Sequence, residues 1–418
     1  MINSRNNDIL NFQEPGALDE ELLNVPGFVN ELANHTLAQA HSPNRALAVM
    51  GATAMLAHLA GRTYTDTHGT RTNLYLVALG ETGIGKDAPR RVNRQLADAI
   101  GDTRALTDET ASGQALEEAL VKHPAMLFQP DEAESFFGAM RGSDNAAAAL
   151  SNRVRKLYSA SAGLFAVRST AKHPEGAIIV NPHLTMFATG TPEAFYRTLD
   201  SQAIVNGLFG RCLVLEIKDN YQVNCPVTAP LPDDLVDIAK WLFSHEQVAE
   251  DHQILNMITV TETPDAQAAL KASAEYLMTQ RKRLAEAELF SARALVVRMN
   301  EKIAKLAMIY AISESPEKPL ISADAVTWAS KLVNHITKAM LYEAQFHIAE
   351  GKFDALLKRF VGLLSKHGGS LDRRRLIQSL HVDHLTFRRI VITLLLCDSI
   401  IEETECGRNA IYTLKNAA

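Results

Sequence analysis

The sequence predicts an α/β protein with a mostly parallel sheet over about residues 70–218. Short apolar runs typical of buried strands alternate there with helical or polar segments. The chain has 418 residues, of which 47% are hydrophobic and 22% charged, which is ordinary globular usage and enough for two or three domains. These values exclude a disordered chain, a fibrous repeat and a small disulfide-stapled scaffold.

The cysteine spacing and the net charge further limit the classes of protein to which the chain can belong. The four cysteines, Cys212, Cys225, Cys397 and Cys406, lie too far apart for a zinc-finger pattern. The N-terminus has no signal-peptide pattern, and no apolar run is long enough for a membrane span. We therefore expect a reduced, cytoplasmic protein without a structural metal or a membrane partner. The net charge of -6, taken alone, argues against a protein that coats nucleic acid.

The first half of the chain divides into three predicted regions. Residues 1–26 are acidic and predict a flexible arm, and residues 27–69 predict a helical lead-in with helices at 28–40 and 44–61. Residues 70–235 predict the α/β core. Its expected strands are 73–79, 125–128, 183–189 and 211–217.

Two further regions complete the chain. Residues 236–350 predict a helical lid, and residues 351–418 predict three helices followed by a hairpin, the element order of a winged helix. In the lid we expect a strand at 254–260 and helices at 265–287, 290–313 and 323–349. In the last region we expect helices at 353–366, 371–380 and 384–397 and strands at 400–403 and 409–414.

The clearest motif is the segment 80–86, Gly-Glu-Thr-Gly-Ile-Gly-Lys, between a predicted strand and a predicted helix. Gly80, Gly83 and Gly85 allow the backbone to curl around a phosphate, and Lys86 supplies a positive charge for it. This phosphate loop predicts ATP binding. A glycine-rich turn without a ligand is the alternative.

Acidic residues near this loop predict a Mg²⁺ site. Asp87 follows the lysine where such loops normally have Ser or Thr, so it is either a metal ligand or an obstacle to hydrolysis. Asp131 follows the strand 125–128 after Gln129-Pro130 and is the second candidate ligand, while Glu132 is the candidate for polarising the attacking water. The alternative is that Asp131 and Glu132 only begin the next helix.

Three more residues complete the predicted catalytic set. Thr189 ends a strand and is placed to contact the γ-phosphate or water, unless it only forms a turn. Arg211 precedes the next strand, where ring ATPases carry an arginine that reaches across the subunit interface; a surface arginine is the alternative. Arg298 is a candidate for a second, lid-borne arginine.

This order of features resembles AAA+ ATPases and their superfamily 3 helicases. Segment 73–89, with its GKD form of the phosphate loop and the helical lead-in before it, is similar to the YfjI-type family of phage, plasmid and satellite proteins. The resemblance covers about residues 27–345. It implies a P-loop core, ATP and Mg²⁺ as cofactors, and assembly of identical subunits, with a hexamer as the expected ring.

Two segments are candidates for DNA contact. Residues 163–180 predict a hairpin, and in superfamily 3 rings such a hairpin carries a Lys-His pair into the channel; here Lys172 and His173 hold that place, with Arg168 nearby. Residues 141–175 have six basic and two acidic residues, which suits a phosphate track. A solvated surface hairpin is the alternative.

The C-terminal region supplies the second candidate. Residues 353–418 have ten basic and seven acidic residues. In a winged helix the third helix enters the major groove, so Thr386, Arg388 and Arg389 are candidate DNA contacts, with Arg408 on the wing. Winged helices also dock proteins, which is the alternative.

We therefore expect a replication ATPase of a mobile element, either a ring-forming helicase or an origin-melting initiator. The alternative is a winged-helix initiator or helicase loader that uses ATP as an assembly switch without unwinding. A defence ATPase is a third class, but the chain shows no nuclease or toxin signature. Expected partners are single-stranded DNA in the channel, duplex origin DNA, further copies of the chain, and a separate primase or host replication proteins.

Overall fold

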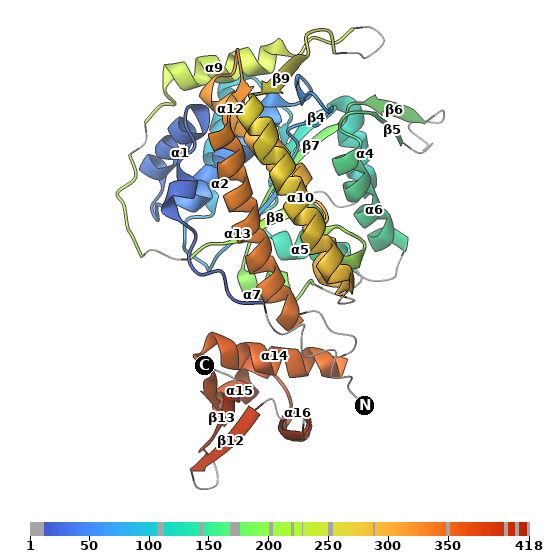
Figure 1. Cartoon of the computed structure of the whole chain (residues 1–418). Helices are drawn as coiled ribbons and strands as arrows, with labels where there is room; N and C mark the ends of the chain where they lie inside the picture. The colour runs from blue at the N-terminus through green and yellow to red at the C-terminus, as the bar shows by residue number, and fades with distance from the viewer. Residues whose placement is uncertain are drawn as a thin grey trace. The chain divides into compact units, whose positions relative to one another are not determined.

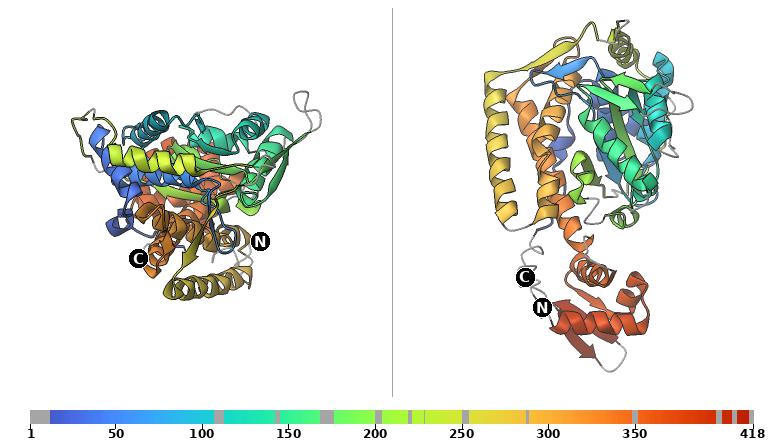
Figure 2. Two further views of the ribbon diagram at one scale, coloured as in Figure 1. Left: turned by 90° about the horizontal axis from the view of Figure 1, so that it is seen from above. Right: turned by 90° about the vertical axis from the view of Figure 1, so that its right-hand side faces the viewer.

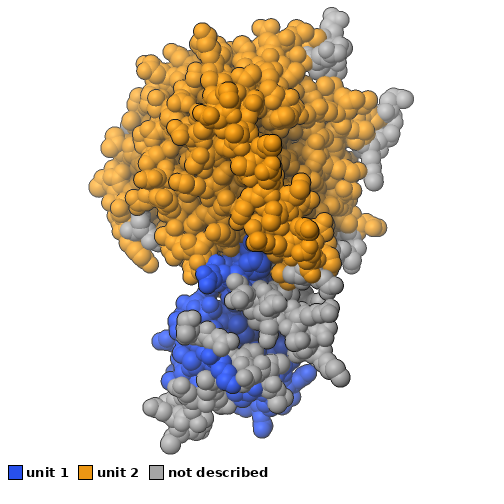
Figure 3. Space-filling view, viewed as in Figure 1, with its two compact units in different colours: residues 1–13, 199–202, 341–418 blue, residues 14–198, 203–340 orange. Residues whose placement is uncertain are grey.

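A computed structural model of the chain forms the basis of the description below. The structure describes residues 12–106, 113–141, 145–167, 176–199, 204–218, 221–227, 229–249, 254–286, 289–347, 352–396, 400–405 and 409–415. The chain divides into two compact units, shown in different colours in Figure 3. The larger unit comprises residues 14–198 and 203–340, and the smaller unit comprises residues 1–13, 199–202 and 341–418.

The larger unit is built on a five-stranded parallel sheet, as the sequence predicts. Its strand order is β3-β4-β7-β2-β8. The strand β7 therefore lies between β2 and β4, although it follows both in the chain. The bounds are β2 Tyr75–Leu79, β3 Ala105–Leu106, β4 Ala125–Phe128, β7 His183–Gly190 and β8 Cys212–Glu216.

Helices cover both faces of this sheet (Figure 2). On one face, α2 (Arg45–Ala60) contacts the sheet, and a Cβ on its Gly51 would lie 3.4 Å from the Phe187 ring. On the other face, the Tyr75 hydroxyl donates to the carbonyl of Val154 in α6 (Asn145–Ser159), at 2.8 Å. Tyr75 pairs with Met186, the neighbour of Phe187, so the two contacts point to opposite faces. The sheet is therefore a central layer, which explains its fully buried strands.

The other elements of the larger unit surround this layer (Figure 1). A second parallel sheet has the order β1-β9-β10 and joins Tyr64–Asp66 to Ile258–Glu262 and Leu320–Ile321. The remaining helices are α1 Phe28–Gln39, α3 Asp87–Ile100, α4 Gly113–Lys122, α5 Ala133–Ala139, α7 Pro192–Tyr196, α9 Asp233–His245, α10 Pro264–Glu286, α11 Phe290–Val296, α12 Met299–Glu314 and α13 Ala323–His347, the last extending into the smaller unit.

One predicted helix is wrong in its extent. The segment expected as a single helix at 290–313 is two helices, α11 and α12, which separate at Val297 and Arg298. Arg298 has φ -108° and ψ 12°, outside the helical range, and acts as the N-cap residue of α12. The break changes the direction of the chain just before the buried part of α12.

The described part of the predicted N-terminal arm is packed against the larger unit. Residues Glu20–Leu23 form a 3₁₀ turn capped by the Asp19 carboxylate. Leu22 is buried, and its carbonyl accepts a 2.9 Å hydrogen bond from the indole of Trp328. Leu22 and Val25 thus contribute to the core despite their acidic neighbours.

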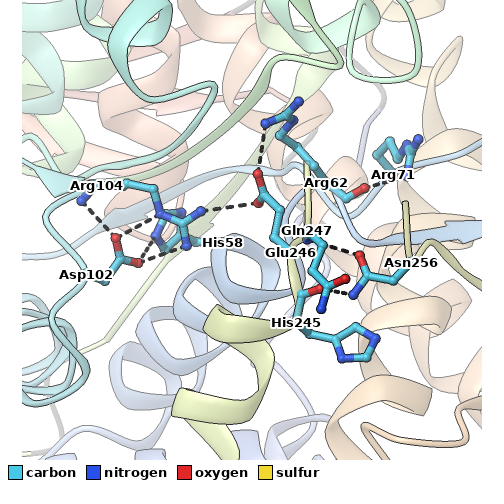
Figure 4. Close-up of polar contacts among 9 residues, drawn as sticks. All are labelled: His58, Arg62, Arg71, Asp102, Arg104, His245, Glu246, Gln247 and Asn256. Carbon is cyan, nitrogen blue, oxygen red and sulfur yellow. Dashed lines mark hydrogen bonds and ion pairs between the residues drawn. The ribbon is translucent and has the colours of Figure 1, made fainter. Parts of the chain in front are cut away.

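A buried polar network holds the C-terminal end of α3 (Figure 4). The carboxylate of Asp102, just after α3, contacts Nε2 of His58 at 2.8 Å and accepts from Nε of Arg104 at 2.9 Å. Glu246 then accepts from Arg104 at 3.3 Å and from Arg62 at 2.8 Å. The network joins α2, α3 and the end of α9, so the helix that follows the phosphate loop is anchored at its far end.

The predicted hairpin forms in the part of it that the structure describes. The strands β5 (Leu164–Val167) and β6 (Ala177–Val180) pair antiparallel, with Leu164 opposite Val180 and Val167 opposite Ala177. Phe165, Val167 and Ile179 are buried, whereas Leu164 and Ile178 are 67% and 64% exposed. The hairpin therefore has one covered face and one free face.

The smaller unit has its own core. It contains α14 Lys352–Lys366, β11 Ser370–Asp372, α15 Arg373–Leu380, α16 His384–Leu396, β12 Ile400–Glu405 and β13 Asn409–Leu414. Its antiparallel sheet has the order β11-β13-β12. The rings of Phe360, Phe387 and Tyr412 lie with centroids 5.8 Å apart in each pair, at the centre of the apolar core. The strand β11 was not predicted, and it delays the start of the second helix to Arg373.

The α/β prediction is thus confirmed at the level of parallel sheets with mixed helices. Among the described residues, no helix combines the length and the apolar character that a membrane crossing requires.

Candidate functional site

The phosphate loop joins β2 to α3 at the carboxyl edge of the five-stranded sheet. Gly83 and Gly85 have φ values of 97° and 88°, which residues with a side chain rarely adopt. A Cβ on Gly85 would lie 2.3 Å from the carbonyl oxygen of Ser42, and one on Gly80 would lie 1.9 Å from Cδ1 of Ile84. The loop conformation therefore requires glycine, for backbone geometry at Gly83 and also for space at Gly85.

Lys86 points back over the ends of two neighbouring strands. Its Nζ donates to the carbonyl oxygens of Gly80 at 2.8 Å and Gly190 at 3.1 Å. These carbonyls follow β2 and end β7, respectively, so the ammonium group lies at the carboxyl edge where the two strands meet. In the described chain no carboxylate forms an ion pair with it. Its charge is thus held by neutral oxygens beside the loop.

Arg90 brings the two candidate Mg²⁺ ligands together. Its Nη2 lies 2.7 Å from Oδ1 of Asp87 and 2.9 Å from Oδ1 of Asp131. The Arg90 side chain is only 12% exposed, whereas the carboxylates are 81% and 52% exposed. Arg90 was not predicted from the sequence. Its position three residues after Asp87, on the same face of α3, was the available signal.

Thr189 fixes Asp131 from the neighbouring strand. The Thr189 hydroxyl donates to Oδ1 of Asp131 at 3.0 Å, and the Thr189 amide donates to the carbonyl of Pro130 at 2.9 Å. Gln129 is buried and accepts from Asn93 in α3 at 2.9 Å. The Gln129-Pro130 insertion therefore carries the chain from the end of β4 across to the end of β7, which places Asp131 beside Thr189.

Glu132 and Glu134 share the start of α5. The Glu132 side chain is exposed and accepts from Oγ of Ser135 at 2.7 Å, and its carbonyl accepts from the Ser135 and Phe136 amides. Glu134, which the sequence analysis did not single out, has a buried Oε2 with no hydrogen-bond partner. A Cβ on Gly190 would lie 2.4 Å from that oxygen. Glu134 is thus the glutamate whose carboxylate lies directly against the end of β7.

Arg211 lies at the amino edge of the sheet, the side where the strands begin, opposite the carboxyl edge. It directly precedes Cys212, which pairs with Tyr75 at the start of β2, whereas the phosphate loop follows the end of β2. Five residues of strand separate these ends, about 16 Å at ~3.3 Å per residue. The Nη1 group of Arg211 donates to the carbonyl of Gly207 at 2.7 Å. Arg211 therefore does not reach the phosphate loop of its own chain.

Arg298 belongs to the same edge as Arg211. Its Nη1 donates to Glu301 at 2.7 Å. Burial lowers the pKa of Arg211, and the positive charge of Arg298 lowers it further. The predicted second arginine therefore neighbours the first arginine, and the structure does not bring it to the phosphate loop.

Two buried lysines in α12 also bind this edge. Nζ of Lys302 donates to the carbonyl of Cys212 at 3.2 Å, and Nζ of Lys305 donates to the carbonyl and side-chain oxygens of Asn73 at 2.9 and 2.6 Å. Burial lowers the pKa of each lysine to about 8. These residues were not predicted, because the sequence of a helix does not show which partners its lysines meet.

The structure places only some of the predicted DNA contacts. Arg388 and Arg389 are exposed on α16, where the Arg389 guanidinium lies 5.0 Å from the centroid of the Phe353 ring. The Thr386 hydroxyl donates to Asp383 at 2.7 Å and so helps to cap α16. This hydrogen bond and those from backbone amides lower the pKa of Asp383. Arg168, Lys172, His173 and Arg408 lie outside the described residues.

The donor set at the carboxyl edge suits a hard divalent cation. Asp87 and Asp131 offer exposed carboxylate oxygens beside the phosphate loop, and such oxygens together with phosphate oxygens and water are what Mg²⁺ prefers. Across the described ranges, no group of three or more His, Cys, Asp or Glu side chains is arranged to hold a metal ion. The protein ligands present therefore fit a metal ion whose remaining ligands a bound phosphate and water would supply.

Comparisons with known proteins assign no family. No protein-family model matches the chain, and no curated protein matches it in sequence. The geometry of the site therefore carries the functional argument.

Proposed function

We propose that the chain is an ATP-dependent DNA replication protein of a mobile element, built on an AAA+-like P-loop core with a C-terminal winged helix. The observation that carries this proposal is the convergence of Lys86, Asp87, Asp131 and Thr189 at one carboxyl edge of a parallel sheet. Ligands of open α/β sheets bind at that edge, where the strand order reverses direction. Here β3, the next strand of this sheet after β2, lies at the far edge of the sheet, and β7 later lies directly beside β2.

The residues at this edge divide the work of phosphoryl transfer to water. Lys86 neutralises phosphate oxygens, and Asp87 and Asp131 hold the Mg²⁺ shell. Bound Mg²⁺ would neutralise negative charge on the phosphate groups. Thr189 orients Asp131, and Glu132 or Glu134 polarises the attacking water, since both lie at the start of α5 beside β7.

The position of Arg211 supports assembly. From the opposite edge of the sheet, Arg211 can reach a nucleotide bound at a phosphate loop only on another copy of the chain, as in the ring that the AAA+ resemblance implies. The smaller unit supports DNA binding, because it has three helices, a three-stranded antiparallel sheet and exposed Arg388 and Arg389 on its third helix. We therefore propose a ring that couples ATP hydrolysis to the movement or melting of DNA.

The test compares ATP hydrolysis by the wild-type chain and Lys86→Ala, with and without single-stranded DNA. We expect DNA to stimulate hydrolysis in the wild type and the stimulation to disappear in Lys86→Ala. Lys240→Ala is the matched control, because Lys240 is an exposed lysine on α9. A wild-type chain that binds no nucleotide and hydrolyses none would contradict the proposal.

A second function is an ATP-switched initiator or loader that does not unwind DNA. One observation favours it: Arg90 already neutralises both acidic ligands, Asp87 and Asp131, with Asp87 standing where phosphate loops normally have a hydroxyl. A strand-displacement assay separates the two functions. Assembly with ATP but no displacement would identify the loader, whereas displacement that requires Lys86 would identify the helicase.

A further inference from the structure

A cavity of about 550 Å³ opens in the larger unit, beside the hairpin. Its walls come from α4, α6 and β5, and Arg211 lies among its lining residues. We call this cavity the basic pocket, because Arg153, Arg155, Lys156 and Arg211 all line it. Its volume lies within the range of about 300–1,000 Å³ that is typical of small-molecule sites. The basic pocket is separate from the phosphate loop, none of whose residues contributes to its lining.

The charges of the basic pocket are not balanced. Glu117 is the one carboxylate among its lining residues, and it already accepts from Nε of Arg153 at 2.7 Å. Arg155 instead donates to the carbonyl of Asn206 at 2.8 Å, and Arg211 donates to that of Gly207. Backbone carbonyls orient these two guanidinium groups without neutralising them. The pocket therefore has a surplus of positive charge.

One further detail points to an anionic ligand. Lys156 is exposed at the rim, and no ion pair holds its ammonium group within the described chain. Because Arg155 and Arg211 are already held in place, an entering anion would lose little by ordering them. Planar guanidinium groups of this kind suit phosphate oxygens.

Part of the lining of the basic pocket is apolar. It comes from Leu164, Phe165 and Ala166 of β5, and Leu164 is 67% exposed. A site lined by cations and by an apolar strand suits a ligand that joins a phosphate to an uncharged body. The sugar and base of a nucleotide supply such a body. An isolated inorganic anion would contact only the cationic residues and leave the apolar residues of β5 without a partner.

We propose that the basic pocket is a second phosphate site, which binds the phosphate of a nucleotide unit while β5 contacts its sugar or base. The charge argument is independent of the proposed function; only the choice of a DNA strand as one source of the nucleotide rests on it. The other source is a free nucleotide. Lys156 contacts the phosphate from the rim, and Arg155 contacts it from inside.

The first experiment measures binding of a fluorescent oligothymidylate to the full chain without ATP. Because Lys156 is exposed, Lys156→Ala and Lys156→Glu leave the fold intact, and Lys240→Ala controls for the loss of one surface lysine. We expect Lys156→Ala to weaken binding by about threefold to tenfold and to reduce the slope of log affinity against log salt by about one. Lys156→Glu weakens binding further, and Lys240→Ala leaves it unchanged.

The second experiment tests free nucleotide as the source. It measures binding of a fluorescent ADP in a Lys86→Ala background, where the phosphate loop no longer contributes. Residual ADP binding that Lys156→Glu removes, with oligothymidylate binding unaffected by that change, identifies free nucleotide as the ligand. If neither probe responds to either Lys156 variant, the second phosphate site does not exist. Failure of the proposed function shows separately, as wild-type chain that does not hydrolyse ATP.

Discussion

The two ends of the strands in the five-stranded sheet differ in charge balance. We call them the carboxyl edge, where the strands end, and the amino edge, where they begin. At the carboxyl edge, Lys86, Arg90, Asp87 and Asp131 form a balanced set in which Arg90 bridges both acids. At the amino edge, Arg211 and Arg298 lie beside the buried Lys302 and Lys305, and Glu301 is the acid that pairs with Arg298 and Lys305. The same sheet thus has balanced charges at one end, where we propose that a metal and phosphate bind, and an excess of cations at the other.

Under the proposed function, this difference means that one copy of the chain does not contain a complete ATPase centre. The cations of the amino edge gain a counter-charge if the phosphates bound at the carboxyl edge of a second copy approach them. Such an arrangement makes hydrolysis depend on assembly, whereas nucleotide binding needs only one copy. Variants that act on one edge at a time separate these two requirements.

The largest expected effect comes from Arg211→Ala. We expect hydrolysis to fall by at least about a thousandfold while nucleotide affinity stays near that of the wild type, because Arg211 lies far from its own phosphate loop. Steady-state hydrolysis and equilibrium binding of a nucleotide analogue measure the two quantities. The melting temperature of the variant shows whether loss of the Gly207 contact disturbs the fold.

Mixing variants gives the Arg211 prediction a stricter form. Lys86→Ala and Arg211→Ala should each be inactive, but their mixture should regain part of the activity, since one copy supplies an intact Lys86 and its neighbour an intact Arg211. Arg211→Lys, which keeps the charge but not the planar group, should recover little. A mixture as inactive as its components would show that the two edges do not meet between copies.

A middle-sized effect is expected from the buried lysines. Burial lowers the pKa of Lys302 and Lys305 from 10.5 to about 8, whereas an unfolded lysine keeps its proton up to the higher value. Between these values the unfolded state binds more protons, so the free energy of unfolding rises with pH, by at most about 1.4 kcal/mol per pH unit for each lysine. Above about pH 9 this gain is opposed in part, because burial raises the pKa of Cys212 from 9.0 to about 12, and above about pH 10 burial of Tyr75 and Tyr158, which raises the pKa of each, opposes it as well.

Urea unfolding at about pH 8 and about pH 10 measures this dependence. Lys305→Met should reduce the rise, and Lys271→Met, at an exposed position of α10, should leave it unchanged. A wild-type stability that stays constant or falls over this interval would show that the lysines retain their ordinary affinity for protons. In that case the amino edge would be more accessible to water than its contacts indicate.

Sequence patterns were sufficient where the chemistry is local. The glycine-rich turn between β2 and α3 was predictable because its glycines and Lys86 lie within seven consecutive residues, and the structure shows why Gly83 and Gly85 are needed. The strands β2 and β4 were predictable because each is a short, fully apolar run between helical segments, whereas the two-residue strand β3 was not predicted. In both cases the signal and the structure lie within one stretch of chain.

Other features depend on distances that no local pattern contains. The strand β11 is three residues long and exists because it pairs with β13, about forty residues later. The break between α11 and α12 has neither glycine nor proline to signal it. Arg90 and Glu134 acquire their roles only when α3, α5 and the ends of β4 and β7 meet. Tertiary contacts, rather than propensity, decide these features.

The smallest effect is expected from Arg90, which tests whether the carboxyl edge is balanced as described. Arg90→Ala removes the cation between Asp87 and Asp131, so the two carboxylates are left to bind Mg²⁺ without competition from a guanidinium. We expect the Mg²⁺ concentration that gives half-maximal nucleotide binding to fall by about threefold to tenfold, which corresponds to roughly 0.7–1.4 kcal/mol. Arg90→Lys keeps a positive charge and should lie between the variant and the wild type. If the Mg²⁺ concentration at half-maximal nucleotide binding is instead higher in Arg90→Ala than in the wild type, Arg90 holds the two acids in place for the metal and does not compete with it.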